Sequence, residues 1–270
     1  MPKNKMKRLI FALLFLPLLI SAAEKIVSLS PTVTQLILYL DGGDRLCGRS
    51  SACSFPQTAS LPVAGDLGRP FPEAVLSTGG KTVISDIAHP EANWDILRRY
   101  KVQVQLLDTS SISRLPENIR IIGRLLGNPD AGKIAGMLEQ KITRMRKAIP
   151  EKTVKGVILF GTAPLITCGR KSFITDAMKL AGIENVAGNA GNGYFIITPE
   201  YLYRSEPEVI IIIGVPREVA GHDLKHGLLR SLPAVKKSRI IFADPEKWSR
   251  LTPDILDAAE NLHRELKRIL

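Results

Sequence analysis

The stretch "NPDAGKIAGMLEQKITRMRKAIP", residues 128–150, lies between two halves of the chain and decides its architecture. Asn128 and Pro129 are typical of a helix start, and Asp130 is stabilised there by the positive end of the helix dipole. Pro150 ends the pattern. About 20 residues at 1.5 Å each give a rod of about 30 Å, the width of a small domain. The apolar residues recur at helical spacing and form one face: Ile134, Leu138, Ile142, Met145 and Ile149.

Short β-rich runs alternate with helical patterns on both sides of this helix. Continuous apolar runs such as "VIIIIG" at 209–214 indicate parallel strands covered by helices on both faces. The predicted fold class is therefore α/β: two α/β lobes with central parallel sheets, joined by one long backbone helix, with a ligand cleft between the lobes. We predict an N-terminal lobe at 24–127, the backbone helix at 128–150 and a C-terminal lobe at 151–270. Strands are expected at 25–30, 81–86, 102–108, 154–161, 208–214 and 238–244, and further helices at 32–41, 91–100, 117–126, 172–181, 199–205 and 253–269.

The first 23 residues have the pattern of a secretory signal peptide. Basic residues without an acid open the chain, an apolar run follows at 9–20, and "SAA" at 21–23 supplies the small residues that a signal peptidase needs. Cleavage is expected after Ala23. The apolar run is too short to span a bilayer, which takes roughly 20 residues, and no cysteine follows the cleavage site to carry a lipid anchor. We predict an exported, periplasmic protein.

Net charge, histidine spacing and cysteine content limit the classes of ligand, partner and metal site that are expected. Loss of residues 1–23, which carry four Lys/Arg and no acid, lowers the formal net charge from +11 to +7 and favours an anionic ligand or an acidic partner. The basic residues are scattered, so nucleic acid is not expected. The histidines lack metal-ligand spacing, and we predict neither a metal site nor a resident cofactor. Cys47 and Cys53 either form a disulfide across a short loop or remain buried thiols.

The segment "KIVSLSPTVTQLILYLDGGDRLCGRSSACSFP", residues 25–56, resembles the opening of a known family. That family is the periplasmic substrate-binding proteins of ABC importers for cobalamin and iron chelates, the class with a helical backbone between two lobes. Similarity continues through "LPVAGDLGRPFPEAV" (61–75), "GTAPLITCGRKSFITDAMKLAGIENVAG" (161–188) and "KWSRLTPDILDAAENL" (247–262). The resemblance implies a non-enzymatic monomer that delivers a small ligand to a membrane permease dimer with its cytoplasmic ATPase.

The expected ligand site lies in loops at the carboxyl ends of strands, where open α/β sheets bind their ligands. "SLSPT" at 28–32 follows a strand and begins a helix, so Ser30, Pro31 and Thr32 can face a ligand, although plain helix capping explains Ser30 equally well. The resemblance implies further ligand contacts from the first lobe (Ala52, Phe55, Leu67 and Arg69), from the glycine-rich loop 188–196 (Tyr194 and Phe195) and from "EKWSR" (Glu246, Lys247, Trp248, Ser249 and Arg250).

Two of these side chains have a clear chemical use. Trp248 offers a flat face for stacking a macrocycle, with packing between helices as the alternative, and Arg250 offers a charged fork for carboxylates or phosphates. A solvated loop position is the alternative for Arg69. Aromatic residues typical of cobalamin binders are missing near Leu67, Asp86 and Leu106, which leaves the ligand open.

Glu91 and Glu200 each follow a proline at an expected helix start, and the two residues lie 109 positions apart. Such an acid is ordinary, because it interacts with the helix dipole by about 0.3–1 kcal/mol. The family resemblance gives the two residues a role, since one exposed glutamate on each lobe docks onto arginines of the importer's membrane subunits. Two charge-assisted contacts at opposite ends of a rigid rod would orient the docked protein.

Cobalamin or another corrinoid is the first predicted ligand, and a ferric siderophore or haem is the alternative. An anionic chelate would suit Arg69, Arg170 and Arg250, whereas haem would require an axial ligand such as Tyr194 or His89. The alternative of another class is an exported α/β hydrolase, but no G-x-S-x-G elbow is present, and "GHDLKHG" at 221–227 is expected to be a loop. A binding domain that serves a sensor is the third interpretation.

Overall fold

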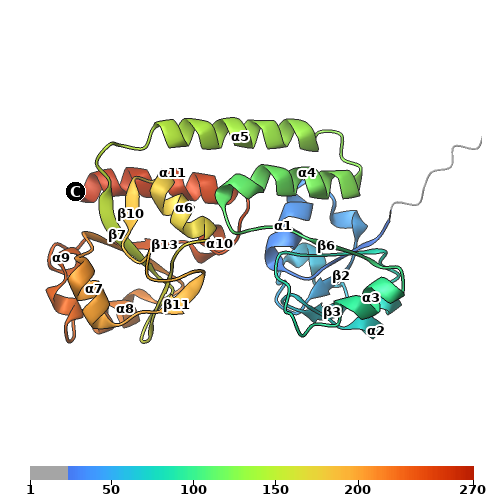
Figure 1. Ribbon diagram of the computed structural model, residues 1–270, viewed down its shortest axis with the longest axis horizontal. Helices are drawn as coiled ribbons and strands as arrows, with labels where there is room; N and C mark the ends of the chain where they lie inside the picture. Colours follow the sequence, from blue (N-terminus) through green and yellow to red (C-terminus); the bar gives the residue numbers. More distant parts are fainter. Residues whose placement is uncertain (1–23) are drawn as a thin grey trace, which may run out of the picture.

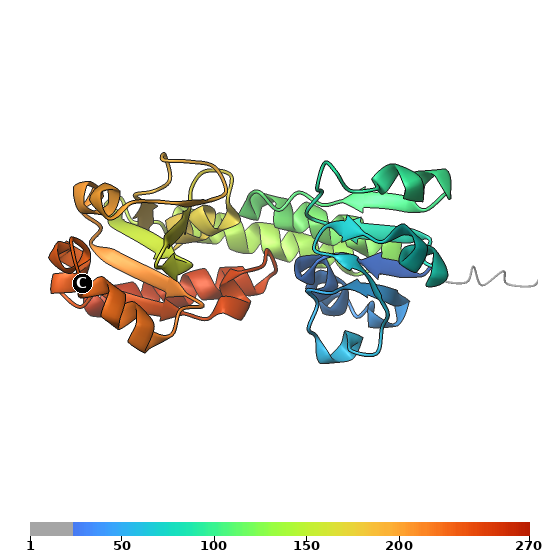
Figure 2. The ribbon, with the colours of Figure 1, turned by 90° about the horizontal axis from the view of Figure 1, so that it is seen from below.

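The computed structural model describes residues 24–270, so the predicted signal peptide and its cleavage after Ala23 lie outside the described residues. Two α/β lobes hang below a layer of helices (Figure 1). Seen from below, the bridging helices are visible between the separated lobes (Figure 2). The predicted α/β fold with two lobes on parallel sheets is confirmed.

The N-terminal lobe contains a six-stranded sheet in the order β4-β3-β2-β1-β5-β6. Its neighbours pair in parallel except for β3 and β4, which form a tight antiparallel hairpin. The turn of this hairpin contains Gly68, whose φ of 66° favours glycine. The strands are β1 (Ile26–Ser28), β2 (Leu46–Ser50), β3 (Val63–Asp66), β4 (Arg69–Pro70), β5 (Thr82–Ser85) and β6 (Gln103–Leu106).

The C-terminal lobe combines a parallel sheet with an antiparallel one. The parallel sheet has the order β10-β7-β12-β13, and a second sheet has the order β11-β9-β8. The apolar run of β12 is fully buried, as expected for a central parallel strand. The strands are β7 (Val154–Leu159), β8 (Gly161–Thr162), β9 (Leu165–Cys168), β10 (Ile183–Asn185), β11 (Tyr194–Ile196), β12 (Val209–Ile213) and β13 (Ile240–Ala243).

Helices cover the sheets and join the lobes. In the N-terminal half they are α1 (Pro31–Tyr39), α2 (Pro72–Ser77), α3 (Trp94–Arg99) and α4 (Leu115–Leu126), and α5 (Ala131–Lys147) follows as the long connecting helix. The second half contains α6 (Phe173–Leu180), α7 (Pro199–Ser205), α8 (Arg217–Leu224), α9 (Pro233–Lys236), α10 (Pro245–Trp248) and α11 (Asp254–Ile269). Short 3₁₀ turns lie at Gly43–Arg45, Pro56–Thr58, Ile112–Arg114 and Leu229–Ser231.

The bridge between the lobes is a layer of helices rather than α5 alone. Helix α5 runs across the top of both lobes, with α4 and α11 beneath it (Figure 1). One continuous cluster of buried apolar side chains passes from α1 and α4 through α5 to α6 and α11. Because the cluster is shared, bending the lobes apart would expose apolar surface, which holds the gap between them.

Helix α5 confirms the predicted apolar face with small changes at its ends. Leu138, Ile142 and Met145 are buried, and Ile134 and Ile149 pack against the same cluster. The helix begins at Ala131 rather than at the predicted proline, because Oδ1 of Asn128 accepts a hydrogen bond from the Asp130 amide at 2.8 Å and forms a turn first. The predicted boundaries of the lobes, after residues 127 and 150, remain predictions.

Three other expectations require correction. The helix predicted at 91–100 begins only at Trp94, so Glu91 lies in a turn. The glycine-rich loop predicted at 188–196 contains strand β11, because its last residues pair with β9. The loop predicted at 221–227 contains the end of α8. Strand β11 is short and depends on its pairing with β9, which periodicity alone does not show.

Candidate functional site

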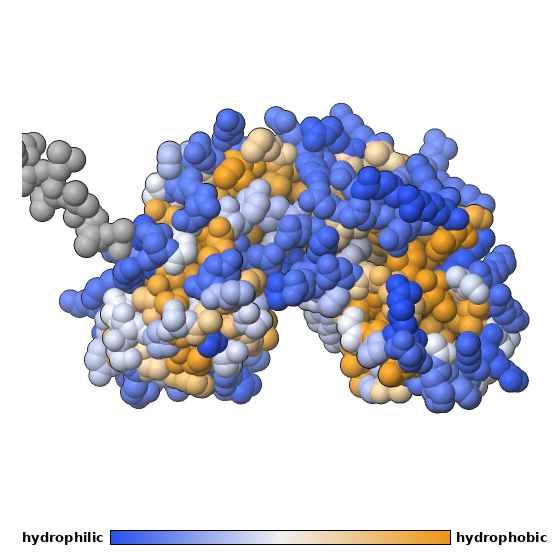
Figure 3. All heavy atoms as spheres, turned by 180° about the vertical axis from the view of Figure 1, so that it is seen from behind, coloured by the Kyte–Doolittle hydropathy of each residue, from blue (hydrophilic) through white to orange (hydrophobic). Residues whose placement is uncertain are grey.

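A cleft of about 580 Å³ separates the two lobes. In the space-filling view the lobes flank a notch that is open below and closed above by the bridging helices (Figure 3). Side chains from both lobes line the cleft, which is the arrangement needed to hold a ligand between two rigid bodies. The lining residues are Ser30, Pro31, Thr32, Leu67, Asp86, Ile87, Leu107, Asp108, Thr109, Ser110, Lys171, Ser172, Phe173, Gly193, Tyr194, Ser249 and Arg250.

The N-lobe wall is formed where β1, β5 and β6 end. Ser30 follows β1 and caps α1, since its hydroxyl accepts a hydrogen bond from the Val33 amide at 3.1 Å. Asp86 directly follows β5. The carboxyl ends of parallel strands meet at one edge of the sheet, so these residues reach the same wall. Ser30, Pro31 and Thr32 line the cleft, and Ser30 also caps α1.

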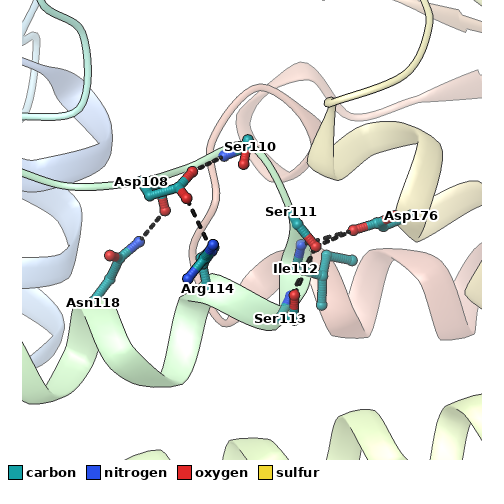
Figure 4. Close-up of polar contacts among 8 residues, drawn as sticks. All are labelled: Asp108, Ser110, Ser111, Ile112, Ser113, Arg114, Asn118 and Asp176. Carbon is teal, nitrogen blue, oxygen red and sulfur yellow. Dashed lines mark hydrogen bonds and ion pairs between the residues drawn. The ribbon is translucent and has the colours of Figure 1, made fainter.

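The segment that follows β6 is held by an acid at each end (Figure 4). Asp108 accepts hydrogen bonds from the Ser110 amide and from Nε of Arg114, both at 2.9 Å. These contacts, with that of Ser110 the largest, lower the pKa of Asp108. The backbone carbonyl of Asp108 also accepts a hydrogen bond from Nδ2 of Asn118 at 2.9 Å.

The same segment is fastened to the other lobe. The Asp176 carboxylate on α6 accepts hydrogen bonds from the Ser111 hydroxyl at 2.5 Å and from the Ile112 amide at 3.0 Å (Figure 4). The chain therefore reaches the C-terminal lobe before α4 returns to the N-terminal one. This crossing holds the segment 108–112, part of which lines the cleft, in place relative to both lobes.

The C-lobe wall carries Lys171, Tyr194 and Arg250. Nη1 of Arg250 donates to Gln35 on α1 at 3.1 Å, and the guanidinium carbon lies 4.9 Å from the centre of the Phe55 ring. Gln35 in turn donates to Asp254 at 2.8 Å. Arg250 therefore bridges the lobes, and its charge is held at the cleft by a hydrogen bond and a cation–π contact.

The strand β11 decides between the two predicted aromatic residues. Tyr194 lies on the cleft, whereas Phe195 packs over Gly169 and Gly191 inside its own lobe. Neighbouring side chains of a strand point to opposite faces, so only one of them can reach the ligand. Tyr194 is about half exposed, yet desolvation by the surrounding protein raises the pKa of its phenol to about 12.

The expected stacking surface of Trp248 is absent from the cleft. Trp248 is 3% exposed and belongs to the core cluster beneath α11. This correction follows from the short helix α10, which turns Trp248 inward while Ser249 and Arg250, just beyond its end, reach the cleft. Packing between helices, the alternative considered for Trp248, is what the structure shows.

Several other expected ligand contacts also lie outside the cleft lining. Glu246 and Lys247 are exposed on α10, and Ala52 lies in an exposed turn after β2. Phe55 reaches the site only through Arg250. Leu67 does line the cleft. Sequence resemblance located the right segments but did not show which side chains face the gap.

Arg69 and Glu91, predicted for ligand and for docking respectively, bind each other. Nη2 of Arg69 lies 2.6 Å from Oε1 of Glu91, and Nδ1 of His89 lies 3.8 Å from the same oxygen. Neither Arg69 nor His89 belongs to the cleft lining. The pair is exposed, and such surface ion pairs contribute about 0–1 kcal/mol to stability.

Cys47 and Cys53 are free thiols, so the disulfide considered for them is not formed. Cys47 lies at the start of β2 and hydrogen-bonds to Thr78, whereas Cys53 lies beyond the end of that strand and contacts Thr34. An extended strand rises about 3.3 Å per residue, which separates the two sulfurs. Burial raises the pKa of the Cys53 thiol.

Within residues 24–270 no group of three or more His, Cys, Asp or Glu side chains is placed to hold a metal ion. No helix in the same range has the length and apolar character needed to cross a membrane. The rings of His222, near the end of α8, and His226, just beyond it, are tilted relative to each other with centres 4.4 Å apart, and neither residue lines the cleft.

Comparison with known proteins agrees with this architecture. The family model described as periplasmic binding protein matches residues 26–247. The chain belongs to this family. The members of the periplasmic binding protein family are non-enzymatic components of transport systems, which disfavours the exported hydrolase, and membership implies an extracytoplasmic location.

Individual family members resemble the chain over nearly its whole length. The vitamin B12-binding protein of Yersinia pestis (strain Pestoides F) is 24% identical, covering 97% of this chain and 92% of the relative. The periplasmic heme-binding protein RhuT from Roseiflexus sp. RS-1 is 26% identical, with a TM-score of 0.77 and coverage of 92% and 99%. The periplasmic vitamin B12 binding protein BtuF of Vibrio cholerae is 22% identical, with a TM-score of 0.79 and coverage of 92% and 98%, and shares the fold. These proteins place the chain among binding proteins of the B12, haem and iron-chelate type without selecting one ligand.

Proposed function

We propose that this protein is the extracytoplasmic substrate-binding protein of an ABC importer and that its ligand is a corrinoid, with cobalamin the first candidate. The observation that carries the proposal is the cleft of about 580 Å³, into which both lobes direct hydroxyl and charged groups. A corrinoid ring is surrounded by amide side chains, which such groups can bind by hydrogen bonds. The similarity to vitamin B12-binding proteins supports the same ligand.

Haem is the second candidate, because Tyr194 brings a phenol hydroxyl to the cleft wall. A phenol can serve as the axial ligand of haem iron. Since the pKa of Tyr194 is raised to about 12, iron ligation would have to remove its proton. His89, the other axial ligand considered, contacts Glu91 outside the cleft lining and is not proposed again. An anionic ferric siderophore, the remaining alternative, would suit Lys171 and Arg250 on the same wall.

The proposed partner is a membrane permease dimer with its ATPase, and the protein is proposed to act as a monomer. Glu200 is exposed in the first turn of α7 after Pro199, as predicted for a docking residue. Its own backbone amide and the Thr198 hydroxyl lower its pKa, which keeps it ionised. Glu91, the residue predicted for the other lobe, is already paired with Arg69.

Glu73 replaces Glu91 in this proposal. It follows Pro72 in the first turn of α2, just as Glu200 follows Pro199 in α7. Glu73 is exposed and forms no ion pair within residues 24–270. Helices α2 and α7 both lie on the side of the lobes away from α5 (Figure 1), so the two carboxylates could meet one membrane surface together.

Calorimetric titration of the protein lacking residues 1–23 tests the ligand. The probes are cyanocobalamin, haemin and a ferric hydroxamate, and Arg250→Gln serves as the matched variant. We expect saturable binding of cyanocobalamin at one site per chain, weakened by the variant because a charged donor at the cleft is lost. Tighter binding of haemin or of the hydroxamate would transfer the proposal to that ligand. Absence of binding by all three would overturn it.

A further inference from the structure

Asp86 is an acid at the cleft whose carboxylate is not fully hydrogen-bonded by the protein itself. It directly follows β5 and contributes to the cleft lining. One of its carboxylate oxygens is buried, and no hydrogen-bond donor reaches this oxygen in the described part of the chain. Most buried polar atoms in folded proteins have a partner, so an unpaired carboxylate oxygen at a binding cleft calls for an explanation outside folding.

Asp108, the other acid that lines the cleft, differs from Asp86 in this respect. Asp108 is satisfied by Ser110 and Arg114. Lys171 and Arg250, on the opposite wall, form no ion pair with Asp86 or with any other acid of residues 24–270. The cleft therefore presents a carboxylate without an ion-pair partner on one wall and cations without one on the other.

Asp86 is only partly buried, so a ligand that fills the cleft would cover the part of the side chain that is still open to solvent. Burying a carboxylate is unfavourable unless hydrogen-bond donors or a positive charge replace the water around it. Because no hydrogen-bond donor reaches Oδ1 of Asp86 and no cation within residues 24–270 forms an ion pair with this carboxylate, the ligand has to supply such a contact. A carboxylate on the ligand would make the burial of Asp86 more unfavourable, since two like charges would be buried together.

We propose that Asp86 is a specificity-determining residue that accepts hydrogen bonds from N–H groups of the ligand. It selects a macrocycle with amide side chains and disfavours a macrocycle with carboxylate side chains. This inference rests on the proposed function, because it names the ligand chemistry that the same cleft recognises.

The test compares two macrocycles in calorimetric titrations. Cobinamide is a corrinoid with amide side chains and no phosphate, and haemin carries two carboxylates. The variants are Asp86→Asn, which keeps the shape and removes the charge, and Asp86→Ala, which removes both. Asp95→Asn, an exposed acid on α3 that pairs with Arg98, is the matched control for the loss of one charge.

We expect Asp86→Ala to weaken cobinamide binding about tenfold or more, the usual effect of losing a hydrogen bond to a charged group. Asp86→Asn should strengthen haemin binding severalfold while it weakens cobinamide binding, and Asp95→Asn should change neither. Melting temperatures of all variants identify any loss of folding. A damaged cleft would weaken the binding of both ligands, whereas a selective role of Asp86 changes the affinities for cobinamide and haemin in opposite directions.

Two outcomes overturn the inference while leaving the proposed function intact. One is cobinamide binding by the parent protein that neither Asp86 variant changes. The other is equal weakening of cobinamide and haemin, which would give Asp86 a structural role only. If the parent protein binds neither macrocycle nor cobalamin, the proposed function itself fails.

Discussion

Trp248 and Arg250 stand two residues apart, and the structure gives them opposite roles. The indole is buried in the core that joins the lobes, whereas the guanidinium lies at the cleft. Side-chain chemistry alone made both residues suitable for a ligand. Their position relative to the end of α10 separates them.

The first prediction concerns Trp248. Because the indole is 3% exposed, Trp248→Ala is expected to lower the free energy of unfolding by about 3–5 kcal/mol. Ser249→Ala, at the exposed neighbouring position, should change it by less than about 0.5 kcal/mol. Urea denaturation monitored by circular dichroism measures both. A stable Trp248→Ala protein that no longer binds ligand would mean that the indole stacks on the ligand after all.

The second prediction concerns the pH dependence of stability at Asp108. Its pKa in the folded protein is lowered by Ser110 and Arg114, so its contribution to stability is present above the unfolded pKa of about 3.9 and is lost as pH falls through the folded pKa. Asp108→Asn should therefore lower the melting temperature at pH 7 and reduce the further loss on acidification below about pH 4.

The control for this prediction is Glu265→Gln, an exposed acid on α11. It should leave the melting temperature at pH 7 nearly unchanged. Parallel melting curves of the parent protein and Asp108→Asn between pH 7 and pH 2 would argue against a stabilising role of the ionised Asp108.

At the scale of elements, the connection between the lobes depends on how closely α4 and α5 pack. A Cβ atom added to Gly123 on α4 would lie 2.0 Å from the Cβ of Ala131 on α5. Gly136, on α5 itself, has open space at the corresponding position. Glycine therefore has a different effect in each of these helices. In α4 it allows the close approach of α5, whereas in α5 it only weakens the helix.

The third prediction uses this contrast. Gly136→Ala should raise the free energy of unfolding by about 0.5–1 kcal/mol, because alanine restricts the unfolded chain and favours the helix. Gly123→Ala should lower it, since the two helices would have to move apart. Thermal melts of the two variants measure the difference in sign. A destabilised Gly136→Ala protein would contradict the open surroundings of that position.

At the scale of the whole molecule, the shared core fixes two lobes side by side and leaves their lower ends free. The acids Glu73 and Glu200 lie in the first turns of short helices at those ends, one on each lobe. Two attachment points on one rigid body would orient the protein on a symmetric partner.

The fourth prediction concerns docking. Glu73→Gln with Glu200→Gln should reduce ligand uptake by the reconstituted importer about tenfold, because two charge-assisted contacts are lost. Ligand affinity in solution should not change, since neither residue lines the cleft. Glu91→Gln is the control and should retain uptake within about twofold. Loss of uptake in Glu91→Gln alone would restore Glu91 as the docking residue.

The sequence by itself determined the α/β class, the long helix with its apolar face and the segments that approach the cleft. These features follow from periodicity and from apolar runs, which are local properties of the chain. The missed short strands, such as β9 and β11, are stabilised by pairing with partners elsewhere in the chain, so no local pattern marks them.

Only the tertiary structure decided which side chains face the gap. Tyr194 rather than Phe195 reaches the cleft because β11 pairs with β9 in one register. Arg69 on β4 and Glu91 in the turn before α3 are brought together as an exposed ion pair, and Arg69 does not line the cleft. The orientation of a side chain depends on the packing of whole lobes, and residues distant in the sequence set that packing.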